Sequence, residues 1–304
     1  MITRMARAVL LSVGVFHTAS LLADALIPPL IQRQLDLPER KIDVGIAALT
    51  FAKEVDPDVD IAGYSRRIDQ LVDGARSVIQ RQGRYDPDSV VRALNTFFYQ
   101  VEGFHYDFSP DAYNKPENRY LTGVLDTKQG TCFNLPMLYM AVAQRLGYPV
   151  YPVTAPDHVF LRFVSPDLQE SNIEATAGGG YSPDEDYIER LHISARGVRS
   201  GAYLKTLSYR QFLALLLETN AIAFGQRGQL DKAIHYLEKV VQIYPKSAPT
   251  YNSLRIAYIM KSKQARAMSN DIVADAYREK AEQAFKRAEE LGYTKAQPLL
   301  SRGG

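Results

Sequence analysis

Apolar residues recur at intervals of three and four residues over three segments between Pro38 and Gln100. These segments are 42–54, 61–80 and 87–100, and Asp-Pro pairs or glycines separate them. One stripe consists of Ile68, Leu71, Val72 and Ala75. This spacing predicts helices that each bury one face.

The next part of the chain, from residue 103 to Pro149, predicts a loop followed by two helices. Residues 103–119 are rich in Asp, Asn, Pro and aromatic residues, which is typical of an ordered loop, and residues 120–125 predict a short helix or turn. A second helix begins near Cys132 and ends at Gly147 and Pro149. Its predicted buried stripe is Tyr139, Val142, Ala143 and Leu146.

After this helix the period of apolar residues changes from about 3.6 to about 2. Residues 150–153, 158–164 and 172–175 predict strands, and 165–167 form a turn between the last two. Helices followed by an antiparallel sheet predict an α+β fold. Glycines 178–180 then open a loop beside the sheet.

From Tyr209 onward the pattern is helical again and contains a repeat. One unit matches the small, aromatic, glycine and proline positions of a tetratricopeptide helix pair at Ala221, Phe224, Gly228, Ala233, Leu237 and Pro245. A second unit is partial, with matches at Tyr251, Leu254, Tyr258, Ala281, Phe285 and Ala288 and extra residues around 261–275. Two units are fewer than a free-standing stack needs, so we expect this tail to pack on the preceding domain.

The start of the chain has the features of a signal peptide. Arg4 and Arg7 precede an apolar stretch over 8–16, no acidic residue precedes Asp24, and small residues permit cleavage after Ala25. Residues 1–25 are therefore expected to be removed on export to the periplasm or the medium. The alternative is a cytoplasmic protein with an uncleaved packed helix, because the apolar run is interrupted by His17, Thr18 and Ser20.

Composition narrows the range of partners. The net charge is +2, and no basic run alternates with aromatic residues, so nucleic acid is not an expected partner. No stretch in the mature chain approaches the roughly 20 apolar residues that span a bilayer. The single cysteine excludes an internal disulfide and leaves the redox compartment open.

The candidate chemistry centres on Cys132, the only cysteine. It follows a glycine at the start of a helix, where unpaired amides stabilise a thiolate and an oxyanion. His158 begins one predicted strand, and Glu174 lies on one face of the next together with Asn172 and Thr176. In a hairpin centred near Pro166 they are nearly opposed, with Cβ atoms about 5 Å apart, so the carboxylate can hold the imidazole.

Each of these residues also has a simpler interpretation. Cys132 can be a small buried core residue, His158 a core or capping residue, and Glu174 a solvated residue at a sheet edge. The three groups together favour a nucleophilic cysteine site. Zinc is not expected, because no metal-binding spacing links the histidines, which are His17, His105, His158, His192 and His235. The glycines at 178–180 lack the features of a phosphate or dinucleotide loop, so no cofactor is expected.

Three motifs give the sequence a family resemblance. They are Gly130-Thr131-Cys132 with its helix up to Pro149, Ala155-Pro156-x-His158-Val159-Phe160, and Asn172-Ile173-Glu174-Ala175-Thr176. The chain resembles the transglutaminase-like cysteine hydrolase superfamily, and in particular a bacterial branch with a helical preface and a tetratricopeptide tail. The resemblance implies a papain-like α+β core over 26–207 and an all-α tail over 208–304.

By this resemblance, Cys132 is the nucleophile, His158 the general base and acid, and Glu174 the orienting carboxylate, although aspartate is commoner at the last position. Candidates for a second oxyanion donor are Gln129, Asn134 and Tyr120.

The resemblance implies acyl transfer at amide or peptide bonds of a peptide or protein, by hydrolysis or by transfer to an amine. The alternative is a catalytically silent scaffold that recruits a protein partner through the tail.

Overall fold

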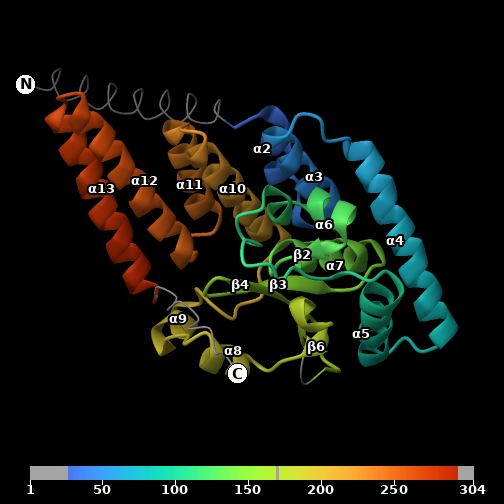
Figure 1. The fold of residues 1–304 in the computed structure, drawn as a ribbon. Coiled ribbons are helices and arrows are strands. Elements are labelled where there is room, and N and C mark those ends of the chain that lie inside the picture. The colour runs from blue at the N-terminus through green and yellow to red at the C-terminus, as the bar shows by residue number, and fades with distance from the viewer. Residues whose placement is uncertain (1–26, 169–170, 294–304) are drawn as a thin grey trace, which may run out of the picture.

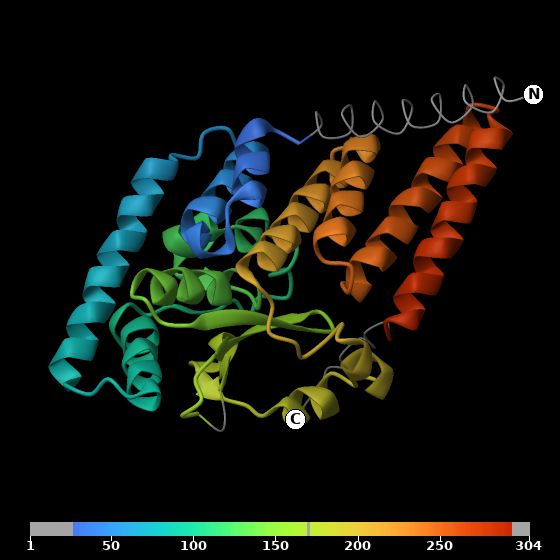
Figure 2. The same ribbon diagram turned by 180° about the vertical axis from the view of Figure 1, so that it is seen from behind.

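The computed structural model describes residues 27–168 and 171–293, so the predicted signal peptide lies outside the described residues. The chain folds into an α+β core followed by an all-α tail, as expected (Figure 1). The long helix α4 (Ile61–Gln82) lies on the opposite side of the molecule from the last two tail helices (Figure 2).

The N-terminal helices agree with the periodicity of the sequence. The elements are α2 (Pro29–Asp36), η1 (Glu39–Lys41), α3 (Val44–Val55), α4, α5 (Pro87–Asn95) and the π-helical turn η2 (Thr96–Val101). Asp43 caps α3 by accepting a hydrogen bond from the Ile46 amide at 2.8 Å. Gly83 ends α4 with φ 67°, which a residue with a side chain rarely adopts. The three predicted helices are confirmed.

The segment 103–119 contains more regular structure than a loop. It includes β1 (His105–Tyr106) and the 3-10 helix η3 (Pro116–Arg119), and α6 (Leu121–Thr127) follows. Strand β1 pairs in parallel with β2 (Gln129–Gly130). This pairing places the aromatic segment beside the cysteine motif, which the sequence did not predict.

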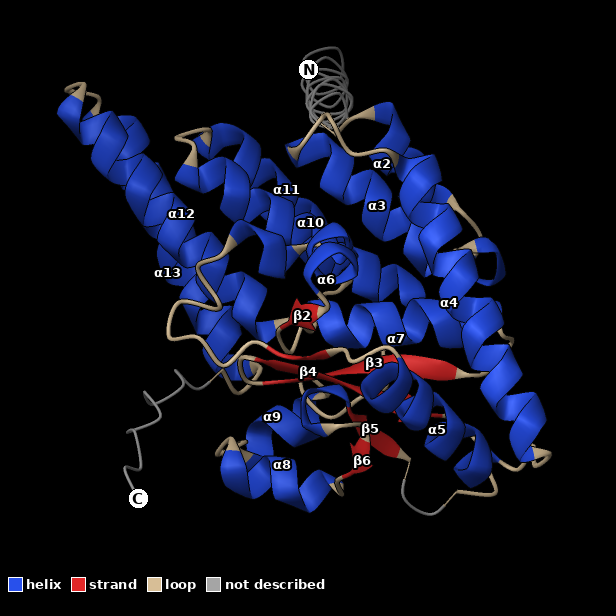
Figure 3. Cartoon of the chain, turned by 45° about the vertical axis from the view of Figure 1, so that its right-hand side comes forward, coloured by secondary structure: helices blue, strands red, loops and turns tan. Residues whose placement is uncertain are grey.

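Helix α7 (Asn134–Arg145) lies across one face of a four-stranded antiparallel sheet (Figure 3). The strand order follows the chain: β3 (Val150–Ala155), β4 (His158–Phe163), β5 (Asn172–Glu174) and β6 (Gly180–Tyr181). The three predicted strands are confirmed. The short helices η4 (Ala175–Ala177), α8 (Asp184–Arg190) and α9 (Ala195–Ser200) then complete the core.

The tail consists of two antiparallel helix pairs. They are α10 (Tyr209–Gln226) with α11 (Leu230–Ile243), and α12 (Ala248–Ala267) with α13 (Asp271–Glu290). The extra residues expected around 261–275 lengthen the second pair, whose helices have 20 residues each.

The tail and the core share one hydrophobic cluster. Leu213, Leu217 and Phe224 of α10 belong to the same buried cluster as Leu49 and Phe51 of α3. At this interface the buried carboxylate of Glu54 accepts a hydrogen bond from Asn220 at 2.8 Å and pairs with Lys232 at 3.0 Å. The charge of a largely buried core carboxylate is thus balanced by a lysine of the tail, and an asparagine of the tail donates a hydrogen bond to it.

Candidate active site

The turn before α7 holds the cysteine in place. The Thr131 amide donates to Asn134 Oδ1 at 2.7 Å, and the Leu135 amide donates to the Thr131 carbonyl at 3.2 Å. A Cβ atom on Gly130 would lie 2.4 Å from Asn134 Oδ1, so this close approach requires glycine. Cys132 therefore lies two residues before the first residue of α7, in a turn whose shape is fixed by its neighbours.

Cys132 is buried, with 7% of its surface exposed. Its Sγ lies 3.7 Å from the carbonyl oxygen of Asp157, in the turn between β3 and β4, and 3.8 Å from the hydroxyl of Tyr113. Asp157 has φ 51°, in the left-handed region, which makes the turn tight and brings His158 to the start of β4.

His158 and Glu174 are in direct contact. His158 Nε2 lies 2.7 Å from Glu174 Oε2, and both side chains are largely buried. This contact leaves Nδ1 as the ring nitrogen available to Cys132. Burial alone would lower the pKa of His158, but hydrogen bonds to Cys132 and Glu174 outweigh it and raise the pKa to about 9.

Glu174 uses both of its carboxylate oxygens. Oε1 accepts from the Thr176 amide at 3.0 Å and from the Thr176 hydroxyl at 2.5 Å, while Oε2 accepts from the Tyr187 hydroxyl at 3.0 Å. Burial would raise the pKa of Glu174, but His158 and Thr176 outweigh it and lower the pKa to about 2. Glu174 is therefore ionised in a buried position and supplied with donors.

The strand register differs from the one expected for the hairpin. Leu161 pairs with Ile173 and Arg162 with Asn172, so the continued register places Phe160 opposite Glu174. His158 is two residues further along the same face, and the predicted near-opposed pair is wrong. A diagonal pair of this kind is about 7–8 Å apart at the backbone, so the additional methylene of glutamate helps to span the distance.

The loop after Glu174 is anchored to the N-terminal helices. Tyr99 donates to the Ala175 carbonyl at 2.9 Å, and Asn95 donates to the Gly179 carbonyl at 2.7 Å. Gly179 has φ 77°, and a Cβ atom there would lie 2.0 Å from Asn95 Oδ1. The helical preface thus fixes the position of the carboxylate strand.

Two of the three candidate oxyanion donors are engaged elsewhere. The Tyr120 hydroxyl donates to Asn220 at 3.1 Å, at the interface with the tail. The amide of Asn134 donates to the carbonyls of Glu117 and Tyr120, at 3.4 and 3.3 Å. The structure therefore does not support an oxyanion role for either residue. Gln129 is exposed on β2, three residues before the cysteine.

Two tyrosines near the thiol were missed from the sequence. Tyr113 lies 3.8 Å from Cys132 Sγ through its hydroxyl, and its hydroxyl is 2.7 Å from that of Tyr106. Tyr187, which contacts Glu174, was missed as well because α8 has a largely polar sequence. The aromatic content of 103–119 was the available signal for the first two, but nothing local indicated that β1 pairs beside Gly130.

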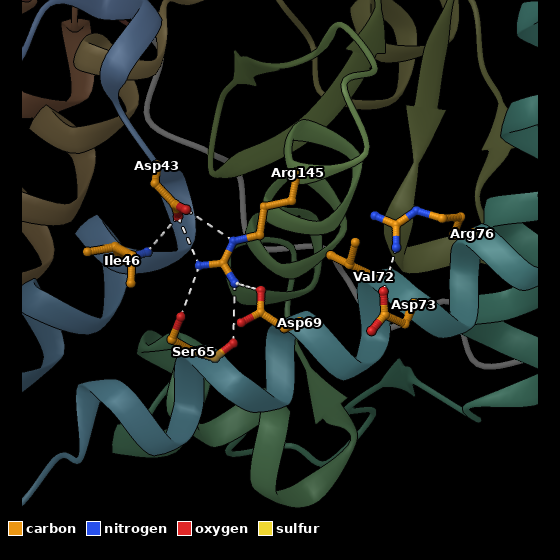
Figure 4. Close-up of a pocket in the computed structure, with 8 residues that line it drawn as sticks. All are labelled: Asp43, Ile46, Ser65, Asp69, Val72, Asp73, Arg76 and Arg145. Carbon is orange, nitrogen blue, oxygen red and sulfur yellow. Dashed lines mark hydrogen bonds and ion pairs between the residues drawn. The ribbon is translucent and has the colours of Figure 1, made fainter.

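The other end of α7 is anchored by an arginine (Figure 4). Arg145 extends into a surface hollow, where it pairs with Asp43 at 3.1 Å and with Asp69 at 2.7 Å and donates to the Ser65 hydroxyl at 3.2 Å. These groups belong to α4 and to the cap of α3. The hollow is therefore a structural ion-pair site that holds the cysteine helix against the preface.

Within 27–168 and 171–293, no group of three His, Cys, Asp or Glu residues is arranged to hold a metal ion. No helix within those same ranges combines the length and apolar character needed to cross a membrane.

The turn before α7 and the sheet residues His158 and Glu174 lie within the region that matches a known family. A family model described as the transglutaminase-like superfamily matches residues 62–218, which is more than half of the chain. The chain belongs to this superfamily.

Several individual proteins are similar to this chain. The UPF0162 protein of Xylella fastidiosa strain Temecula1 is 22% identical over 254 residues, which cover 82% of this chain and 89% of the relative. The UPF0162 protein of Pasteurella multocida is 35% identical over 72 residues, 24% of this chain and 26% of the relative. A crystal structure of menin aligns with a TM-score of 0.43 and 16% identity, over 86% of this chain and 73% of menin.

Proposed function

We propose that this protein is a cysteine-dependent acyl-transfer enzyme that acts on amide or peptide bonds. The observation that carries the proposal is the 2.7 Å contact between His158 Nε2 and Glu174 Oε2, in an imidazole whose pKa is raised by Cys132 as well as by Glu174. A carboxylate that fixes one ring nitrogen leaves the other to exchange a proton with the nucleophile.

The proposed reaction has two stages. The thiolate of Cys132 attacks the carbonyl carbon, and the resulting oxyanion collapses and expels an amine that takes its proton from His158. Water or a second amine then gives its proton to His158 and attacks the acyl-enzyme, which releases the acid or a new amide and restores the thiolate. Exclusion of water from the acceptor side decides between hydrolysis and transfer.

The electrostatics of the pair support this assignment. With the pKa of His158 raised to about 9 and that of Glu174 lowered to about 2, both groups are charged at neutral pH. A charged imidazole beside Cys132 favours a thiolate nucleophile and a proton donor for the leaving amine. The substrate proposed for such a site is a peptide or a protein.

The test is a product search with the full chain. Wild type and Cys132→Ala are incubated with a mixture of synthetic peptides, with and without a primary amine such as cadaverine, and products are identified by mass spectrometry. Cleaved, deamidated or amine-linked peptides that need Cys132 support the proposal. Identical product patterns for both proteins would favour a scaffold that binds a partner through its tail without turnover.

A further inference from the structure

Of the three oxyanion candidates from the sequence, Tyr120 and Asn134 are engaged elsewhere and Gln129 is exposed on β2, which leaves the other groups around the thiol as candidates for a further donor. The hydroxyl of Tyr113 lies 3.8 Å from Cys132 Sγ, although 61% of the residue's surface is exposed to solvent. The residue thus directs its polar end inward, to the atom at which the reaction takes place.

The separation between the two atoms suits a group that contacts substrate. A hydroxyl in short contact with the sulfur would block the path of an incoming carbonyl group. At 3.8 Å the hydroxyl is close enough that a carbonyl oxygen on the attacked carbon, lying to one side of the line between the sulfur and the hydroxyl, can accept a hydrogen bond from it. The hydroxyl of Tyr106, at 2.7 Å from that of Tyr113, can donate to it and strengthen it as a donor.

The loop that carries Tyr113 is held rigidly. The buried carboxylate of Asp107 accepts from Lys115 at 2.8 Å and from Asn118 at 2.8 Å, which closes the loop at its base. The Asp107 amide donates to the Gly130 carbonyl at 2.8 Å, two residues before the cysteine. The hydrogen bond from Lys115 holds the pKa of the Asp107 carboxyl well below its ordinary value, so this closure persists at neutral pH.

We propose that Tyr113 is a catalytic residue that donates its hydroxyl hydrogen bond to the oxyanion formed when Cys132 attacks a carbonyl group. This role rests on the acyl-transfer function proposed above. The second donor in this proposal is the backbone amide of Cys132, because the amides of Thr131 and Phe133 already donate to the side chains of Asn134 and Thr131.

In the proposed step the thiolate forms a carbon–sulfur bond while the π electron pair of the carbonyl group moves onto oxygen. Tyr113 keeps its proton throughout. When the pair returns, the bond to the leaving group breaks. Desolvation of the hydroxyl and the nearby charge of Cys132 raise the pKa of Tyr113 well above its ordinary value, which keeps it a donor over the working pH range.

Two small reagents distinguish an oxyanion donor from a residue that covers the thiol or stabilises the thiolate. Acetylation of Cys132 by p-nitrophenyl acetate passes through an oxyanion, whereas alkylation by iodoacetamide displaces iodide at a saturated carbon and forms none. Replacing Tyr113 by Phe should therefore slow acetylation by at least about tenfold and leave the rate and pH profile of alkylation unchanged. Tyr106→Phe should slow acetylation less, because the donor itself remains.

Tyr85→Phe is the matched control, since Tyr85 is also exposed and lies in the turn before α5. Both rates should match wild type in this variant, and all variants should melt at the wild-type temperature. Equal acetylation rates for Tyr113→Phe and wild type would overturn the proposal. Faster alkylation would show that Tyr113 merely covers the thiol, and an equal fall in both rates would show that it acts on the thiolate. Wild type that reacts with neither probe at Cys132 would instead refute the proposed function.

Discussion

Glu174 reaches His158 across a register in which the two residues are offset diagonally, not opposed. The reach depends on the length of glutamate and on donors that hold both carboxylate oxygens. The length of the side chain at position 174 therefore suits the register of β4 and β5.

The first prediction concerns the length and charge of this carboxylate. Glu174→Asp keeps the charge but shortens the side chain, and Glu174→Gln keeps the length but removes the charge. Both variants should acylate Cys132 about a hundredfold more slowly than wild type, because the imidazolium loses its partner in each. Stopped-flow acylation with p-nitrophenyl acetate measures the effect. A fully active Glu174→Asp variant would show that the length of the side chain at this position is not needed to hold His158.

The second prediction concerns stability as a function of pH. The pKa of His158 rises from 6.5 to about 9, so its contribution is complete below pH 6.5 and is lost as the pH rises through 9. The pKa of Glu174 falls from 4.5 to about 2, so its contribution is complete above pH 4.5 and is lost as the pH falls through 2.

The pair should therefore stabilise the fold most between pH 4.5 and 6.5. Urea unfolding of wild type and Glu174→Gln between pH 4.5 and 9 measures this. The free energies of unfolding should differ by on the order of 2 kcal/mol up to pH 6.5, and the difference should shrink toward pH 9. A difference that does not vary with pH would show that the two charges do not interact in the folded protein.

The third prediction compares two buried tyrosine hydroxyls. Tyr187 donates to Glu174 and stacks on Phe160 with ring centroids 3.9 Å apart, whereas the buried Tyr203 hydroxyl has no partner among the described residues. Tyr187→Phe should keep the stacking and lower the free energy of unfolding by about 2 kcal/mol. Tyr203→Phe should be neutral or stabilising, because it removes an unsatisfied polar group. If both substitutions change the melting temperature equally, the hydrogen bond from Tyr187 to Glu174 does not stabilise the fold.

The periodicity of the sequence predicted most of the fold. Helices α3 and α4 and strands β3 and β4 follow from apolar spacing, because each buries one face of a regular element. The positions of Cys132, His158 and Glu174 followed from motifs at the ends of such elements. These inferences depend on local patterns only.

The remaining features depend on contacts between distant segments. The position of β5 depends on the loop after Glu174, which Asn95 and Tyr99 anchor from the N-terminal helices. The approach of Tyr113 to Cys132 depends on the pairing of two-residue strands, which are too short to have a periodicity. Propensity and spacing carry no information on such contacts.

The fourth prediction concerns the contact between tail and core. Leu217 of α10 is fully buried in the shared cluster, whereas Ile222 of the same helix is 45% exposed. Leu217→Ala should lower the free energy of unfolding by about 3 kcal/mol and should slow acylation only through loss of folded protein. Ile222→Ala is the matched control and should change stability by less than about 0.5 kcal/mol.

A chain ended after Leu207 should aggregate for the same reason, because it leaves the apolar face of α3 uncovered. A soluble and reactive fragment would contradict this and would show the tail to be an independent module.

The central claim is that Cys132 is a nucleophile activated by His158. The most direct measurement is peptide mass spectrometry of the full chain after brief exposure to p-nitrophenyl acetate, for wild type, His158→Ala and, as a control at an exposed histidine, His192→Ala. Our account predicts one acetyl group on Cys132 in wild type and in His192→Ala, and at least about a hundredfold slower labelling in His158→Ala. Equal labelling of Cys132 in all three proteins would contradict it.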